Sequence, residues 1–474
     1  MEYAKQKLQV AIQEEIQEWN ERKDLMLEGS TSSVLAHCCD DPGSPLIMRV
    51  EFPSSKMQDA SGIAVISHAV LDKDPAELSC DSKIFTSLKS SNAVRFSVLT
   101  DILSNHLGID CSMQIPPVLT SAVLLSQRRQ LKEELLQAVY PKLQDGYLLQ
   151  GAEVSLLLVD TEKQLTTPAT ERVLPVLTNA NNFQLQYFEP DIYWKNLQTK
   201  VLGQTMVYVD VVPTTMPLLD PLMNLAPQKT GLVAVAGRQT HGRGRGGNRW
   251  VSPEGCVMFT LHVQQDANSD LGCAPVFLQH LCGLAMVLSI RQIPGYEDLD
   301  LKIKWSNDIV FGGHIKLGGV LVNSMIINGV LHAIIGAGLN VSNSNPTACV
   351  NDVIRQANFE KMKQCADQTS VLKELTKEEV LARIITIFEQ LMEKCTREGL
   401  NQFKNQLYKY WIHSEITKFQ LEMDDGHQID VRVEGLDSEG HLTVTAVDSG
   451  QALALNSLKY SMDVTLQKIF KKRT

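Results

Sequence analysis

Residues 241–250 (HGRGRGGNRW) combine glycines with permanent positive charge. The glycines are Gly242, Gly244, Gly246 and Gly247. Glycine lets a ligand approach the backbone closely, and successive exposed N–H groups form a concavity suited to anions. Arg243 and Arg245 add planar cations that match phosphate or carboxylate. Because strand-like segments at 231–236 and 256–263 flank this run, we expect a mobile lid, anchored at a sheet edge, that closes over a phosphate- or carboxylate-containing ligand.

Other interpretations of the same stretch fit less well. The GxxxxGK[ST] spacing of a P-loop is absent, and no helical pattern follows, as a dinucleotide-binding fingerprint requires. An RGG-type RNA-binding element is disfavoured because the stretch is short and lies between core strands. The formal net charge of −10 also opposes binding of polyanions. A plain surface hairpin remains the structural alternative.

A second polar cluster is predicted within residues 302–319 (KIKWSNDIVFGGHIKLGG). Asn307 and Asp308 follow a strand-like segment, and a hairpin through FGGH can bring Asp308 close to Lys316 at one end of a sheet. The two glycines after Lys316 stand where a strand favours β-branched residues, and glycine in a strand often marks close approach by a ligand. We therefore expect Lys316 to face a ligand, although hairpin ends often carry an ordinary solvated lysine.

Two smaller groups of polar residues have open alternatives. Gly338 and Asn340 lie at the end of another predicted strand, where turn chemistry alone accounts for them. Thr214 and Thr215 precede a short helical stretch and could cap it or bind a neutral polar ligand group. Both groups could line the same pocket as Lys316.

The bulk composition bounds the class of protein. The 474 residues predict two to four domains, with a 44% hydrophobic share that is typical of a protein with a large core. No apolar run approaches the length that spans a bilayer, and the ten scattered cysteines indicate reduced thiols and no structural zinc. The first thirty residues carry seven acidic and four basic side chains without an apolar segment. We therefore expect a cytoplasmic protein with no membrane or nucleic-acid partner; a mitochondrial isoform stays open.

The pattern of strands and helices predicts three regions. Apolar runs alternate with helical patterns near 88–107 and 127–139, which indicates an α/β region. From about residue 201, short strands follow one another, interrupted by a helix at 275–290 and followed by two more helical segments. Three strand candidates after residue 416, separated by turns, indicate a small β-barrel.

Three segments together resemble a known family. They are GRQTHGRGRGGNRW, KIKWSNDIVFGGHIKLGG and IGAGLNVSNSNPT, and they are similar to the characteristic segments of biotin–protein ligases of the animal holocarboxylase synthetase type. The resemblance covers roughly residues 193–474, including YWKNLQTKVLG and YWIHSE. It implies an α+β fold: a class II aminoacyl-tRNA synthetase-like catalytic domain at 193–412, an SH3-like C-terminal domain at 413–474, and an N-terminal α/β region at 1–192 that could screen carrier domains.

The resemblance also implies a reaction with biotin, ATP and Mg²⁺. Biotin is activated as biotinyl-5′-AMP and then transferred to a lysine of the carrier domain of a biotin-dependent carboxylase. Lys316 is expected to bridge the biotin carboxylate and the α-phosphate, and Arg245 to hold the loop over the adenylate. Asp308 is expected to orient or deprotonate the incoming lysine; the alternative is that it caps the turn, in which Ser306 replaces the usual proline of the family.

The remaining residues are expected to bind biotin or ATP. Thr214, Thr215 and Gln239 match positions that recognise the ureido ring, and Trp250 would close the pocket as an apolar wall. The other implied binding residues are Gly242, Arg243, Gly244, Gly246, Gly247, Asn307, Gly318, Gly319, Gly338 and Asn340. Two alternatives remain open: a lipoate–protein ligase with the same fold, and a non-catalytic adaptor that binds a nucleotide or a carrier domain.

Overall fold

The computed structural model describes residues 31–37, 45–52, 62–67, 92–107, 117–179, 183–227, 230–244, 248–344, 347–364, 371–423, 426–457 and 459–472. The chain forms two compact units, residues 1–115 and 116–474. The first unit contains an antiparallel sheet of three strands and a helix that continues into a π-helical segment. These elements are β1 (Thr31–His37), β2 (Pro45–Phe52), β3 (Gly62–Ser67), α3 (Asn92–Asp101) and η3 (Ile102–His106). All predicted site residues belong to the second unit.

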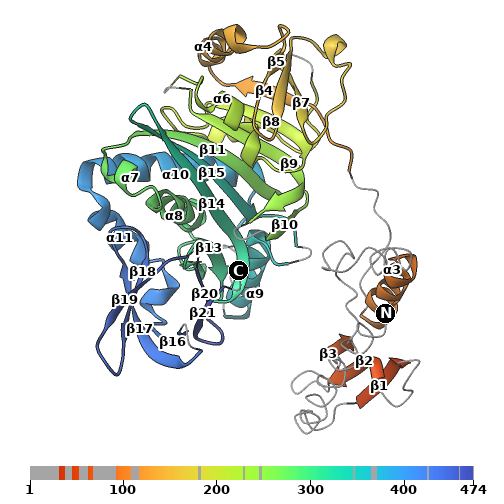
Figure 1. Ribbon diagram of the computed structural model, residues 1–474, viewed down its shortest axis with the longest axis vertical. Coiled ribbons are helices and arrows are strands. Elements are labelled where there is room, and N and C mark those ends of the chain that lie inside the picture. Colours follow the sequence, from red (N-terminus) through yellow and green to blue (C-terminus); the bar gives the residue numbers. More distant parts are fainter. Residues whose placement is uncertain are drawn as a thin grey trace, which may run out of the picture. The chain divides into compact units, whose positions relative to one another are not determined.

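A 12-stranded sheet forms the frame of the second unit (Figure 1). From one edge to the other, the strands are β12 (Leu301–Lys304), β13 (Asp308–Phe311), β14 (Ile315–Ile327), β15 (Val330–Asn340), β11 (Cys256–Asp266), β9 (Leu232–Arg243), β8 (Thr205–Val212), β4 (Ala122–Ser126), β7 (Val173–Leu177), β6 (Ser155–Val159) and β5 (Leu148–Leu149). The remaining strand, β10 (Arg249–Ser252), pairs with β9. The strands predicted from residue 201 onward are therefore confirmed.

The N-terminal part of this unit joins the same sheet. Strands β4, β7 and β6 are parallel, and α4 (Arg129–Val139) follows β4, so the predicted α/β character is confirmed for residues 122–177. Strand β4 pairs antiparallel with β8, from Ser126↔Thr205 to Ala122↔Val209. The domain boundary at 192/193 stays a prediction. Strands on both sides of this position in the sequence, β4 and β8, are hydrogen-bonded in one sheet.

Helices cover both faces of the sheet. On one face, α8 (Phe277–Arg291) and α10 (Lys377–Glu398) pack against each other and the strands (Figure 1). Helix α8 is apolar around most of its circumference, which is typical of a helix buried on all sides. On the other face, η6 (Met216–Leu218) and α6 (Asp220–Met223) pack over β8, β9 and β15. The other helical segments are η4 (Tyr140–Lys142), η5 (Glu162–Gln164), α5 (Pro190–Asn196), α7 (Asp270–Cys273), α9 (Val350–Gln364), α11 (Leu400–Tyr408) and η9 (Ile412–Ser414).

The C-terminal residues form a separate sheet of six short strands. In spatial order, they are β19 (Ala452–Leu455), β18 (Leu442–Ala446), β17 (Gln428–Leu436), β16 (Lys418–Glu422), β21 (Lys468–Lys471) and β20 (Tyr460–Asp463). Strands β16, β17 and β18 are the three that the sequence predicts; the other three were missed. Within the described part of the chain, no helix is long and apolar enough to cross a membrane.

Candidate active site

One cavity of about 430 Å³ brings most of the predicted residues together. Its lining includes Thr214, Thr215, Gln239, Arg243, Gly244, Trp250, Asn307, Asp308, Lys316, Gly319 and Gly338. These residues come from the end of β8, from the β9–β10 hairpin and from the β13, β14 and β15 strands. The expectation that separate polar segments share one pocket is therefore confirmed in its geometry.

The pair formed by Asp308 and Lys316 lies in this cavity. Strands β13 and β14 form the predicted hairpin, and Lys316 Nζ lies 2.7 Å from Asp308 Oδ1. The ammonium group also lies 5.0 Å from the ring centroid of Trp250, close enough for a cation–π interaction. The Lys316 side chain remains 45% exposed, so it can still reach an anion that enters the cavity.

The turn before Asp308 is held by strand β14. The Val320 N–H donates to the Asn307 carbonyl oxygen at 3.1 Å, and the Asn307 Nδ2 donates to the Val320 carbonyl oxygen. The Ser306 hydroxyl donates to Asn307 Oδ1 at 3.1 Å. Asn307 thus fixes the turn as well as lining the cavity.

The two threonines at the end of β8 have different environments. Thr215 does not cap η6 through its side chain; its hydroxyl accepts from Thr260 at 2.8 Å, and its N–H donates to Gln239 Oε1 at 2.8 Å. The Gln239 carboxamide nitrogen keeps a long contact, 3.4 Å, with Ser252 Oγ. Among the described residues, the Thr214 hydroxyl has no hydrogen bond. Thr214 and the Gln239 nitrogen are therefore the groups with capacity left for a ligand.

The glycine–arginine stretch forms a hairpin in which β9 and β10 pair through Gly242↔Trp250 and Arg243↔Arg249. Arg245, Gly246 and Gly247 lie outside the described residues, so their predicted roles are not tested. Arg243 Nη2 lies 2.6 Å from Glu153 Oε2, in the segment between β5 and β6, and this contact lowers the pKa of Glu153. Arg243 also borders a second cavity of about 870 Å³, which Glu153 lines.

Two glycines that the sequence assigns to ligand binding serve internal packing. A Cβ at Gly318 would lie 2.6 Å from the Gly338 carbonyl oxygen, and one at Gly242 would lie 2.8 Å from the Trp250 carbonyl oxygen. Neither glycine lines the 430 Å³ cavity. The close approach that a glycine permits is here made by the neighbouring strand, and a ligand contact of either residue stays a prediction.

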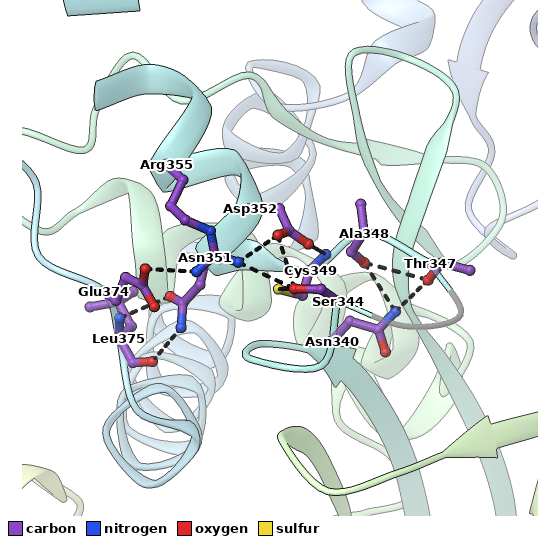
Figure 2. A network of polar contacts seen from close by, with 10 residues as sticks. All are labelled: Asn340, Ser344, Thr347, Ala348, Cys349, Asn351, Asp352, Arg355, Glu374 and Leu375. Carbon is purple, nitrogen blue, oxygen red and sulfur yellow. Dashed lines mark hydrogen bonds and ion pairs between the residues drawn. The ribbon is translucent and has the colours of Figure 1, made fainter. Parts of the chain in front are cut away.

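Asn340 is also absent from the cavity lining. Its side chain is buried, and Nδ2 donates to Thr347 Oγ1 at 2.9 Å and to the Ala348 carbonyl oxygen at 3.3 Å (Figure 2). Its Oδ1 accepts from Asn343 at 2.9 Å. The carboxamide thus ties the end of β15 to the segment before α9, and the expected contact with a ligand stays a prediction.

Several lining residues were not predicted. From the 12-stranded sheet and the segments next to it they are Met216, Asn248, Ser252, Phe259, Val320, Leu321 and Ala337. Gly336, which belongs to the same glycine pattern as Gly338, also lines the cavity. Ser461, Phe470 and Lys472 come from the C-terminal sheet. Nothing in the local sequence around these three indicates a site, because only the tertiary packing of β20 and β21 brings them to the cavity.

Comparison with known proteins identifies relatives of this chain. Residues 208–340 match the model of the biotin/lipoate A/B protein ligase family. The chain is 37% identical over 389 residues to human biotin–protein ligase, covering 82% of this chain and 52% of that protein. It is 32% identical over 243 residues to biotin–protein ligase of Schizosaccharomyces pombe, covering 48% of this chain and 38% of that protein. The chain thus spans about half or less of the length of these two relatives.

Proposed function

We propose that this chain is a biotin–protein ligase of the animal holocarboxylase synthetase type, which the match of residues 208–340 to the biotin/lipoate A/B protein ligase family supports. In the proposed reaction, a biotin carboxylate oxygen attacks the α-phosphorus of ATP and pyrophosphate leaves. The ε-amine of a lysine on a carrier domain then attacks the mixed anhydride, and AMP leaves as the amide forms. The partners are therefore biotin, ATP and the carrier domains of biotin-dependent carboxylases.

The observation that carries this proposal is the position of Lys316. Its ammonium group lies in one cavity with Arg243 and with the neutral polar groups of Gln239 and Thr214. The first step brings two anions together, and a fixed cation between them offsets their repulsion and the charge that develops on the phosphoryl oxygens. Lys316 is suited to this because its side chain is anchored by Asp308 yet partly exposed.

Neutral groups at the other side of the cavity suit the ureido ring of biotin. The Thr214 hydroxyl and the Gln239 carboxamide nitrogen can each donate a hydrogen bond to a carbonyl oxygen without adding charge. Phe259 and Trp250 provide apolar walls for the rest of the molecule. A pocket with apolar walls and a few convergent polar groups is typical of small-molecule sites.

Mg²⁺ fits this site as part of the substrate. Among the described lining residues, Asp308 is the single carboxylate, and it is already paired with Lys316. The described residues contain no cluster of three or more side chains that could hold a metal ion. Mg²⁺ commonly binds substrate phosphates with few protein ligands, so we write the nucleotide substrate as MgATP and assign no protein ligand.

The second step requires a neutral amine at the anhydride. Asp308 is the lining carboxylate that can accept a proton from the incoming lysine or orient it. Its contact with Lys316 means that Lys316 must move toward the adenylate before Asp308 is free to do so. We assign Asp308 to this step on that basis.

We further propose that the C-terminal sheet is an SH3-like barrel that takes part in the site. Its six strands and the register shift in β17 between Val433 and Gly435 support a strongly bent sheet. Ser461, Phe470 and Lys472 of this sheet lie on the cavity wall. A carrier domain that approaches the cavity would therefore contact both the 12-stranded sheet and the C-terminal sheet.

The proposal is tested by incubating the purified protein with MgATP and either biotin or lipoate, in the presence and absence of a carrier domain. Mass spectrometry then detects the acyl-adenylate and the acylated lysine. Biotinyl-AMP and a biotinylated carrier are expected. Formation of lipoyl-AMP alone would show a lipoate ligase, and binding of nucleotide without any adenylate would show an adaptor; either result would overturn the proposal.

A further inference from the structure

His413 lies outside the cavity but contacts the turn that enters it. The side chain is 1% exposed and belongs to η9, the short helical segment between α11 and β16. Its ring Nε2 lies 2.9 Å from the backbone nitrogen of Trp305. A backbone N–H can only donate, so Nε2 accepts and the ring is neutral, with its proton on Nδ1. Burial, followed by the charge of Lys304, lowers the pKa of His413 to about 3, which agrees with a neutral ring.

The turn that His413 contacts is short. Lys304 and Asp308 are paired at the end of the β12–β13 ladder, so only residues 305–307 connect the two strands. Trp305 begins this turn, and Asn307 and Asp308 end it on the cavity wall. Because a connection of three residues has little conformational freedom, a shift of Trp305 would also move Asn307 and the Asp308 carboxylate that is paired with Lys316.

The segment that carries His413 is itself firmly attached to β12. The Ile303 N–H donates to the Tyr410 carbonyl oxygen at 2.8 Å, and Ile303 forms a β-bridge with Trp411. The His413 ring contacts Trp411 edge-on, with ring centroids 4.8 Å apart, and it contacts Phe419 of β16 with centroids 5.7 Å apart. The imidazole is thus held between the first strand of the C-terminal sheet and the turn of the active site.

We infer that His413 is a positioning residue for the proposed adenylation: by accepting the Trp305 N–H, it fixes the turn that presents Asn307 and Asp308 to the cavity. This inference rests on the proposed function. It gives the start of the C-terminal sheet a defined task, which is to set the geometry around Lys316 without touching the substrate. A purely apolar side chain of similar size would fill the space but leave the Trp305 N–H buried without an acceptor.

The test compares three substitutions that separate the hydrogen bond from packing. In H413Q, the side-chain carboxamide reaches the position of Nε2 and can accept the Trp305 N–H. In H413N, a side chain one carbon shorter does not reach, and in H413L there is no acceptor. H262L is the matched control, because His262 is equally buried in the same unit but does not contact the turn or line the cavity.

Two readouts are measured for each folded variant. The first is the kcat and KM of biotin-dependent pyrophosphate release; the second is amide hydrogen exchange of a peptide that covers residues 303–311. Loss of the acceptor is expected to lower kcat about 10- to 100-fold in H413L and H413N, because the buried Trp305 N–H then has no hydrogen-bond acceptor. The kcat of H413Q should stay close to that of the wild type. The KM for biotin should change little, since Gln239 lies on β9 and Thr214 lies between β8 and η6, away from this turn in the chain. Exchange at residues 305–308 should accelerate in H413L and H413N only.

Equal losses of kcat in H413Q and H413N, or unchanged exchange at the turn in H413N and H413L, would overturn the inference. If H413L does not fold, the pair H413Q and H413N decides the question, because both side chains are polar carboxamides. Absence of biotinyl-AMP with the wild-type protein would instead refute the proposed function. The exchange measurement still tests the hydrogen bond in that case, so the two failures are distinguishable.

Discussion

The buried pair of His262 and His332 predicts a specific loss of stability in acid. The two residues lie on β11 and β15, with His262 Nε2 3.2 Å from His332 Nδ1, and both rings are more than 90% buried. When both rings are neutral, one of these two nitrogens carries a proton and donates it in a hydrogen bond to the other. Burial lowers the pKa of His262 to about 4 from its ordinary value of 6.5, with the neighbouring His332 as a second cause.

The size and sign of the effect follow from this pKa. Between about pH 6.5 and pH 4, the unfolded chain binds a proton at His262 and the folded protein does not, so the stability contribution is complete above pH 6.5 and is lost as the pH falls toward 4. A difference of about 2.5 pKa units corresponds to about 3 kcal/mol, at roughly 1.4 kcal/mol per unit. Replacing His262 by phenylalanine keeps an aromatic ring and removes the titration.

The assay is the free energy of unfolding by urea, measured from pH 7 to pH 4 for the wild type and H262F. The wild type should lose about 3 kcal/mol more than H262F across this range. H314Q, which changes an exposed histidine, serves as the control and should follow the wild type. If H262F loses as much stability as the wild type, the argument that burial keeps His262 neutral is wrong.

Four other substitutions test the cavity and its surroundings. Gly338→Ala should leave the thermal midpoint unchanged, because no atom lies within 4 Å of a Cβ at this position, and it should raise the KM for biotin or MgATP, because the new methyl group enters the cavity. Gly318→Ala should instead destabilise the fold by about 1–3 kcal/mol, because its Cβ would lie 2.6 Å from a backbone oxygen. Thr214→Val should weaken biotin binding about tenfold in calorimetry without a change in stability, and equal affinity would remove Thr214 from the site. Glu153→Gln should cost less than about 1 kcal/mol in urea unfolding, because its ion pair with Arg243 is half exposed, and a larger loss would mean that this contact is structural.

Local patterns in the sequence predict those parts of the site that depend on short-range geometry. The pairing of Asp308 with Lys316 follows from a hairpin of known turn residues, and short apolar runs separated by turns identify β8, β9, β11 and β15. The pairing of β4 with β8 does not follow, because periodicity identifies a strand but not its neighbour.

The predicted residues outside the cavity lining show what the sequence leaves undetermined. A glycine at position 318 indicates that something lies close to the backbone. The sequence does not show whether this is a ligand or, as in the structure, the Gly338 carbonyl oxygen. A buried carboxamide such as Asn340 can equally bind a ligand or the protein itself. Phe470 and Lys472 lie more than a hundred residues from Lys316 in the chain, and only the packing of the C-terminal sheet brings them to the same cavity.

The most direct test of the central claim is a single-turnover measurement of biotinyl-AMP formation by the wild type, K316A and K200A. Lys200 forms an ion pair of the same length as Lys316, 2.7 Å, but with Glu393 and away from the cavity. The loss of Lys316 should slow the step at least about 100-fold, the effect of removing one group that stabilises developing charge. K200A should match the wild type. Adenylate formation by K316A at the wild-type rate would contradict the assignment of this cavity as the active site.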